Sequence, residues 1–370
     1  MKITGIELRR VELPLVAPFQ TSFGVEYSRN ALLVRVVTAD AEGWGECVAI
    51  DDPIYSSEYT DGAIDVLRRF LVPAILAPAD ITAAEVGPTL EKFKGHRMAK
   101  AALETAVLDA ELRGAGQSLS GYLGGVRTSV SVGVSVGITS SIGALLDEVQ
   151  GYVDEGYRRI KLKIQPGWDI APTRAVRERF GDTIDLQVDA NTAYGPVDLP
   201  HLTKLDAFEL LLIEQPFDEE DLRSHVRLRG MSSTPICLDE SILSARSTVD
   251  ALELGACDIV NIKPGRVGGY LEARRIHDVC VAHGIPVWCG GMLETGLGRA
   301  ANLALAALPG FTLPGDISAT ARYYDRDITA AFFADSGMMT VPTGPGIGID
   351  PDPEALSSLT AWSEWLQIPD

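Results

Sequence analysis

The middle of the chain repeats one pattern of hydrophobic and polar positions. Short apolar runs, typical of buried strands, each end in one charged residue, and these residues follow one another at steps of 26, 25, 25 and 24 residues. They are Lys163, Asp189, Glu214, Asp239 and Lys263. A strand, a helix and two loops need about that many residues, so the period predicts consecutive βα units of a parallel barrel.

The N-terminal part follows other patterns. In the first 50 residues apolar and polar positions alternate, with turn signals at Pro14, Pro18 and Gly43, which predicts a small antiparallel sheet. From Glu58 onward, strong helix formers with an apolar face predict helices, which Gly114 is expected to end. We therefore expect an α+β domain ahead of the barrel.

These patterns divide the chain into three parts. Residues 1–125 are predicted to form the α+β domain and residues 126–322 the barrel. Residues 323–370 do not repeat the βα period, so we expect this C-terminal segment to return to the first domain.

Composition narrows the function classes. The 370 residues suffice for one barrel with a second domain. The chain has 51 acidic and 32 basic residues, so its formal charge is −19. This charge argues against binding to nucleic acid or to anionic membranes. The five cysteines lack metal-type spacing, and the first residues alternate like a strand, unlike a signal peptide. We therefore expect a cytoplasmic protein.

The five charged strand ends make a candidate catalytic site, because all strands of a parallel barrel end at the same face. Taken singly, each residue could merely cap a helix or begin a turn. Their common register favours catalysis. Asp189, Glu214 and Asp239, with no histidine or thiol at these strand ends, form a hard oxygen site that favours Mg²⁺, or Mn²⁺ as a substitute, over zinc.

Such a cation suits a carboxylate substrate that loses its α-proton, because the enolate places a second negative charge on the carboxylate oxygens. Lys163 and Lys263 would then be the acid and the base. Lys161 lies two residues before Lys163 on the same strand face, so its charge should lower the pKa of Lys163; it is also expected to contact the substrate carboxylate. Two amines four strands apart support racemisation and one-base elimination equally.

The pattern Lys161-x-Lys163, Asp189, Glu214, Asp239-Glu240 and Lys263, with glycine-rich residues 290–296, resembles the enolase superfamily, muconate-cycloisomerase subgroup. Residues 290–298 and 313–318 are most similar to the branch of o-succinylbenzoate synthases and N-acylamino acid (N-succinylamino acid) racemases. The resemblance implies an α/β fold, a modified TIM barrel (β/α)7β with an α+β capping domain. It also implies three Mg²⁺ ligands, Asp189, Glu214 and Asp239, the acid/base pair Lys163 and Lys263, and a homo-oligomer.

Two departures from relatives bear on the substrate. Dipeptide epimerases carry Asp-x-Asp after the last strand to hold a free amino group, whereas this chain has Asp316-x-Ser318. An acylated amine, or no amine, is therefore favoured. Mandelate-type relatives use a histidine base, but His277 and His283 fall in a helix-like segment and are interpreted as surface or packing residues.

The substrate pocket is predicted from both domains. Two loops of the first domain resemble the loops that close over the barrel mouth in this family, and their aromatic residues form either an apolar lid or only the domain interface. The expected pocket residues are Phe19, Phe23 and Tyr55 from these loops, and Ser135, Asn191, Gly291, Met292 and Leu293 from the barrel. Glu240 and Asp316 are expected to support the site, and the fixed charge of Arg266 to lower the pKa of Lys263.

The leading function is therefore Mg²⁺-dependent removal of an α-proton from a small carboxylate substrate. It would racemise N-acylamino acids, or dehydrate the precursor of o-succinylbenzoate in menaquinone synthesis, or do both. A muconate-type cycloisomerase is the alternative within the fold. A non-catalytic barrel that only binds its ligand is the alternative from another class.

Overall fold

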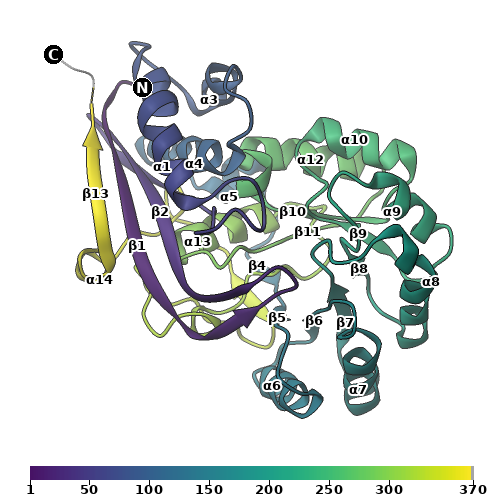
Figure 1. Ribbon diagram of the computed structural model, residues 1–370. Helices are drawn as coiled ribbons and strands as arrows, with labels where there is room; N and C mark the ends of the chain where they lie inside the picture. Colours follow the sequence, from purple (N-terminus) through teal and green to yellow (C-terminus); the bar gives the residue numbers. More distant parts are fainter. Residues whose placement is uncertain (368–370) are drawn as a thin grey trace.

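The computed structural model describes residues 1–367 and comprises an antiparallel sheet with its helices beside a parallel barrel (Figure 1). The antiparallel sheet has four strands in the order β13-β1-β2-β3. Their bounds are β1 (Ile3–Gln20), β2 (Val25–Thr38), β3 (Glu42–Cys47) and β13 (Thr360–Leu366). The sheet predicted for the first 50 residues is confirmed.

The end of the chain completes this sheet. β13 pairs antiparallel with β1, from Ile6 opposite Leu366 to Val11 opposite Thr360. A second short pairing joins β12 (Met338–Thr340) to β4 (Ser129–Ser131), at the start of the barrel. The three-part division of the chain stays a prediction, and its last residues, 368–370, lie outside the described residues.

Helices cover one face of the antiparallel sheet. They are α1 (Thr60–Val66), the π-helical η1 (Leu67–Leu71), α2 (Val72–Leu76), α3 (Ala83–Leu90) and α4 (Arg97–Ala115). The short helix α5 (Leu119–Leu123) packs against α13 (Gly296–Ala306) of the barrel. The prediction that Gly114 ends the long helix is wrong, because the helix continues to Ala115 and Gly116 takes the left-handed conformation, φ 67°, that terminates it.

Two glycines let β3 pack closely on α4. A Cβ on Gly43 would lie 2.2 Å from the Ala106 carbonyl oxygen, and one on Gly45 would lie 2.0 Å from that of Ala102. Side chains at either position would separate the sheet from the helix. This contact fixes Glu46, which lies next on β3 and faces the barrel.

The barrel sheet has seven parallel strands in the order β11-β10-β9-β8-β7-β6-β5. They are β5 (Val134–Val136), β6 (Arg159–Lys163), β7 (Asp185–Asp189), β8 (Ile213–Glu214), β9 (Ile236–Leu238), β10 (Ile259–Ile262) and β11 (Val287–Cys289). The predicted βα period is confirmed, because each of the five charged residues ends one of these strands or directly follows it.

An irregular segment closes the barrel where the eighth strand is expected. Phe311 bridges to Val287 of β11, and Gly315 bridges to Val132 ahead of β5. The Asp316 N–H donates to the Cys289 carbonyl at 2.8 Å. The last strand predicted before Asp316 is thus present only as isolated bridges.

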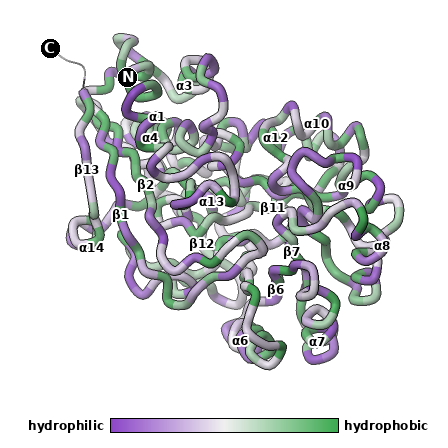
Figure 2. Tube along the Cα trace, viewed as in Figure 1, coloured by the Kyte–Doolittle hydropathy of each residue, from purple (hydrophilic) through white to green (hydrophobic). Residues whose placement is uncertain are grey.

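Helices line the outside of the barrel. They are α6 (Ile142–Asp154), α7 (Ile170–Phe180), α8 (Leu199–Leu202), α9 (Leu222–Arg229), α10 (Ala245–Leu254), α11 (Pro264–Val267), α12 (Tyr270–Ala282) and α13 (Gly296–Ala306), with 3₁₀ turns η2 (Gly181–Thr183), η3 (Pro196–Asp198), η4 (Thr203–Phe208) and η5 (Thr320–Arg322). The short helix α14 (Pro353–Leu359) instead contacts β1 of the antiparallel sheet, just before β13. Green and purple stretches alternate along α6 and α7, as expected for helices with one buried face (Figure 2).

Several smaller expectations can be compared with the described residues. All five cysteines are buried and free. His277 lies within α12, stacks on Phe311 with ring centroids 5.5 Å apart, and bonds the Gly310 N–H, so it is a packing residue. Within residues 1–367, no helix is both long enough and apolar enough to cross a membrane.

Candidate active site

Three of the charged strand ends lie side by side in the sheet. Lys163 is paired with Asp189 across β6 and β7, and Asp189 is paired with Glu214 across β7 and β8. Asp239 and Lys263 follow directly after β9 and β10. All five side chains are buried. The structure therefore gathers the predicted constellation at the carboxyl ends of five neighbouring strands.

Lys163 donates hydrogen bonds to two acceptors. Its Nζ lies 2.6 Å from Asp189 Oδ2 and 2.6 Å from Asn191 Oδ1. Burial lowers the pKa of Lys163, Asp189 opposes this shift, and the charge of Lys161 adds to it. The predicted direction is confirmed, although burial contributes more than the neighbouring lysine.

Lys161 is surrounded by carboxylates. Its Nζ lies 3.2 Å from Asp189 Oδ2 and 3.1 Å from Glu214 Oε2, and it also pairs with Asp316. Burial would lower the pKa of Lys161, but these three carboxylates raise it above its ordinary value. The amine therefore stays charged and cannot serve as a base near neutral pH.

Asp316 joins Lys161 to the first barrel strand. It forms an ion pair with Arg159 at 2.5 Å and accepts a hydrogen bond from Ser135 Oγ at 3.2 Å. Despite burial, the charges of Arg159 and Lys161 hold the pKa of Asp316 below its usual range. The supporting place predicted for Asp316 is thus beside Lys161. Arg159 escaped the sequence analysis because it lies at the start of its strand.

The pKa of Lys263 is not lowered overall, and the contribution of Arg266 to it stays a prediction. Burial would lower the pKa of Lys263, but the Tyr55 hydroxyl and the carboxylates of Glu240, Glu214 and Asp189 raise it overall. Arg266 forms an ion pair with Asp239 and donates to the carbonyls of Ile242 and Asn261, each at 3.0 Å. Its charge is thus directed at a carboxylate of the site.

Gln215 organises the turn that carries Asp239 and was missed from the sequence. Its Oε1 accepts the N–H groups of Asp239 at 2.9 Å and Ser241 at 3.2 Å. Its Nε2 donates to Ser241 Oγ at 2.8 Å and to the Phe217 carbonyl at 3.0 Å. The residue is fully buried and has a left-handed backbone, φ 35°. Its place directly after Glu214 was the available signal.

One cavity of about 50 Å³ brings the two catalytic candidates together with the predicted lid. Nine predicted residues line it: Phe19, Phe23, Tyr55, Lys163, Asn191, Lys263, Gly291, Met292 and Leu293. Ser135 and Lys161 are not among its lining residues. Five lining residues were not predicted: Thr21 lies in the hairpin loop between Phe19 and Phe23, Glu26, Ser28 and Arg29 lie on β2, and Ile50 follows β3.

The aromatic residues of the two loops serve as both lid and interface. Phe23 packs on Tyr55 with ring centroids 5.8 Å apart, and Phe19 packs edge-on against Tyr323 at 6.0 Å. Lys263 Nζ lies 3.1 Å from the Tyr55 hydroxyl, so the lid directly contacts a catalytic candidate. Rings that cover a buried amine exclude water from the reacting atoms.

The carboxylates suit a divalent cation in their chemistry. Asp189, Glu214 and Asp239 supply hard oxygen donors from three adjacent strands, and the two buried oxygens of Asp239 face Lys263 Nζ, at 2.9 Å, and Arg266. Among residues 1–367, however, no three His, Cys, Asp or Glu side chains are gathered closely enough to hold a metal. Ammonium and guanidinium groups occupy their oxygens instead, and would compete with an ion.

Comparison with known proteins places both domains. The Mandelate racemase / muconate lactonizing enzyme, N-terminal domain family matches residues 3–124, and the Enolase C-terminal domain-like family matches residues 144–355. An N-succinylamino acid racemase from Amycolatopsis sp is 65% identical over 366 residues, which cover 99% of this chain and 100% of the relative.

Two further comparisons agree. An o-succinylbenzoate synthase from Geobacillus stearothermophilus is 46% identical over 98% of this chain and 97% of its own length. The crystal structure of an enolase superfamily member from Listeria innocua superposes with a TM-score of 0.95 at 39% identity, covering 99% of both chains. The superposition shows that this chain has the same modified barrel and capping domain as that enolase superfamily member.

Proposed function

Since this chain belongs to the mandelate racemase / muconate lactonizing enzyme family of the enolase superfamily, we propose that it removes the proton α to the carboxylate of an N-acylated amino acid and returns a proton to either face. The substrate class we infer is N-succinylamino acids, for which the Amycolatopsis relative is named. The enzyme is then an isomerase, with dehydration to o-succinylbenzoate as a lyase activity of the same site.

One observation carries the proposal. Lys163 and Lys263 come from β6 and β10, four strands apart in the sheet, and both line the same lidded cavity. A substrate between the two strands presents one face of its α-carbon to each amine. Two amines on opposite faces are what racemisation requires, because one must take the proton while the other gives one.

The two lysines are prepared for different roles. Lys163 has a lowered pKa, so a larger fraction of it is neutral and able to accept a proton. Lys263 has a raised pKa and stays an ammonium, which suits it to donate a proton when the substrate approaches from the other side. The hydrogen bond from Lys263 to the Tyr55 hydroxyl stabilises the ammonium form of Lys263. Racemisation in both directions requires the two lysines to exchange the roles of acid and base.

Enolase superfamily enzymes are generally dependent on a divalent metal, and we assign that site here to Asp189, Glu214 and Asp239, with Mg²⁺ as the ion and Mn²⁺ as a substitute. When bound, the ion would stabilise the negative charge that develops on the substrate carboxylate. Asn191 accepts a hydrogen bond from Lys163 and donates one to Glu240 Oε1 at 2.9 Å. It therefore links the proposed base to the residue that follows Asp239 at the end of β9.

The environment of Asp316 favours a substrate without a free ammonium group. Its carboxylate is already engaged by Arg159, Lys161 and Ser135. Position 318, where a second aspartate would be needed to hold an ammonium, is a buried serine. An acylated nitrogen carries no charge and needs no such partner.

The proposal is tested by NMR in D₂O, with purified protein, Mg²⁺ and N-succinyl-L-phenylalanine, following the α-proton signal together with optical rotation. Parallel loss of both is the expected result. Exchange with retained rotation would contradict two-face transfer and leave the synthase as the main activity. No exchange by the folded, metal-loaded protein would contradict the proposal and favour a muconate-type cycloisomerase, or a barrel that only binds.

Two further assignments belong to the same proposal. We infer a homo-oligomer in the cytoplasm, acting on a small-molecule carboxylate substrate. Light scattering of the purified protein measures the first, with a monomer as the contradicting result. Fractionation of cells that express the chain measures the second, with recovery outside the cytoplasm contradicting it.

A further inference from the structure

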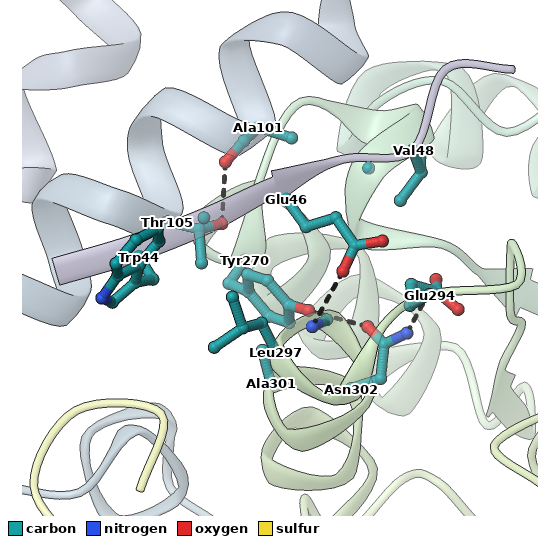
Figure 3. A pocket seen from close by; sticks show the side chains of 13 residues that line it. Trp44, Glu46, Val48, Ala101, Thr105, Tyr270, Glu294, Leu297, Ala301 and Asn302 are labelled. Atoms are coloured by element: carbon teal, nitrogen blue, oxygen red, sulfur yellow. Dashed lines mark hydrogen bonds between the residues drawn. The ribbon is translucent and has the colours of Figure 1, made fainter. Parts of the chain in front are cut away.

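A buried polar seam lies behind the cavity wall, where the capping domain meets the barrel. It consists of Glu46 from β3, Glu294 and Thr295 from the loop before α13, Asn302 from α13 and Tyr270 from α12. Figure 3 shows Glu46, Glu294, Asn302 and Tyr270. All five residues are buried. None of them reaches the catalytic cavity, so the seam can act on the substrate only through what it holds.

Glu46 crosses between the domains to cap a barrel helix. Its carboxylate accepts the Thr295 N–H at 3.1 Å, the Thr295 hydroxyl at 2.6 Å and the Gly298 N–H at 3.2 Å. A Cβ on Gly298 would lie only 2.9 Å from Glu46 Oε2, so the absence of a side chain there permits this approach. A carboxylate at a helix N-terminus accepts hydrogen bonds from the free N–H groups there, and its negative charge interacts favourably with the positive end of the helix dipole.

The helix start that Glu46 caps is directly joined to the turn that lines the cavity. Glu294 Oε2 accepts the Met292 N–H at 2.8 Å, and Glu294 Oε1 accepts from Asn302 Nδ2 at 3.0 Å. Asn302 in turn accepts from the Tyr270 hydroxyl at 2.7 Å. These bonds tie the backbone of Met292 to two barrel helices.

Leu293 is held in a conformation that it would not adopt alone. Its φ of 55° lies in the left-handed region, which is strained for a residue with a bulky side chain. The Tyr324 hydroxyl holds its carbonyl at 2.5 Å. The strain persists because the surroundings fix the turn, and the turn directs Met292 and Leu293 into the cavity wall.

We propose that Glu46 is a positioning residue for substrate selection: by fixing the start of α13 it sets the Met292–Leu293 turn, and with it the space for the substrate's side chain. This inference rests on the proposed function. Met292 Sδ lies 3.5 Å from Lys263 Nζ, so the same turn borders a catalytic candidate. Through Glu46, the capping domain therefore positions the Met292–Leu293 turn of the barrel, in addition to providing the lid.

The chain offers a matched control in Glu104. This buried carboxylate on α4 also crosses to a barrel helix, where it accepts the Leu271 N–H at 3.1 Å at the start of α12, beside Gly269. Burial raises the pKa of Glu104 to about 7, as it does that of Glu46. Both residues are buried at the interface between the domains and cap a barrel helix. Glu46 bonds the loop that carries the turn directly, whereas Glu104 reaches that loop only through Tyr270, Asn302 and Glu294.

The test compares Glu46→Gln with Glu104→Gln on N-succinyl-L-phenylalanine and N-succinyl-L-alanine. Glutamine cannot accept hydrogen bonds from all three donors. Glu46→Gln should therefore raise the KM for N-succinyl-L-phenylalanine about fivefold to tenfold relative to the KM for N-succinyl-L-alanine, whereas kcat for N-succinyl-L-alanine should change by less than about twofold. Glu104→Gln should lose similar thermal stability and keep the ratio of the two KM values. Equal ratios in the two variants would overturn the inference.

Two readouts separate this inference from the proposed function. Tyr324→Phe removes one hydroxyl from the Leu293 carbonyl and should move the ratio in the same direction, even if Glu46→Gln folds poorly. Hydrogen exchange of the peptide spanning residues 290–296 needs no substrate, and should be faster in Glu46→Gln but unchanged in Glu104→Gln. Unchanged exchange in both would refute the inference, whether or not the wild type racemises N-succinylamino acids.

Discussion

At the scale of single residues, the site shows how ordinary groups acquire special acid strength. Lys163 and Lys161 lie two positions apart on one strand, yet the pKa of the first is lowered and that of the second is raised. Lys161 meets three carboxylates, whereas Lys163 bonds one carboxylate and a neutral amide. The count of opposite charges around each buried amine decides the direction.

Gln215 gives a prediction at this scale. Gln215→Met keeps the volume but removes the bonds that hold the Asp239 turn, so the dissociation constant for Mg²⁺ should rise about tenfold. Gln187→Met is the control, because Gln187 is equally buried on β7 but its Nε2 has no hydrogen-bond partner. Titration calorimetry of the metal-free proteins measures both. Equal affinities in the two variants would show that Gln215 does not position Asp239.

Among the helices and strands, the sequence predicts the site residues that recur in each βα unit. It does not predict the site residues that only contacts between distant parts of the chain bring together. The strand ends could be found because each βα unit places one charge in the same register. The hairpin residues Glu26 and Arg29 could not, because only the seating of the capping domain brings them to the barrel mouth. The eighth strand, by contrast, is reduced to two isolated bridges, from Phe311 to Val287 and from Gly315 to Val132.

The buried carboxylates of the capping elements predict a pH dependence. Burial raises the pKa of Glu46 and Glu104 to about 7 and that of Asp109 to about 6. The folded state therefore binds protons more tightly than the unfolded chain, so the free energy of unfolding should fall as pH rises from about 4.5 to 7.

Urea unfolding between pH 5 and pH 7.5, with a chelator present, measures this slope. Glu104→Gln should reduce it by up to one group's share, about 1.4 kcal/mol per pH unit. Asp189 and Asp316 have lowered pKa values and act only below this window. A free energy of unfolding that rises with pH across the window would contradict the assignment.

At the scale of the whole molecule, the two ends of the chain build the capping domain that closes the barrel. β1 is flanked by β2 on one side and by β13 on the other. Arg68 of the π-helical segment pairs with Glu364 at 2.6 Å, and its guanidinium lies 5.7 Å from the Trp362 ring. The barrel's lid therefore depends on residues at the far end of the sequence.

Removal of β13 should loosen the lid without removing the lysines. A chain that ends at Leu359 exposes the edge of β1 and the apolar surface beneath Trp362, so we expect lower thermal stability and a raised KM with the metal site retained. Calorimetry and steady-state kinetics measure the two effects. The double change Arg68→Gln and Glu364→Gln is a milder control that keeps the strand. An unchanged KM in the truncated chain would show that β13 does not support the lid.

Lys163 and Lys263 are proposed to act on opposite faces of the same α-carbon. Exchange of the α-proton in D₂O by Lys163→Ala and Lys263→Ala, each supplied separately with the L and D forms of N-succinylphenylalanine, tests this proposal. We expect that neither variant racemises and that each still exchanges one enantiomer, the opposite one in each case, because the remaining lysine reaches a single face. Exchange of the same enantiomer by both variants, with fold and metal binding intact, would contradict it.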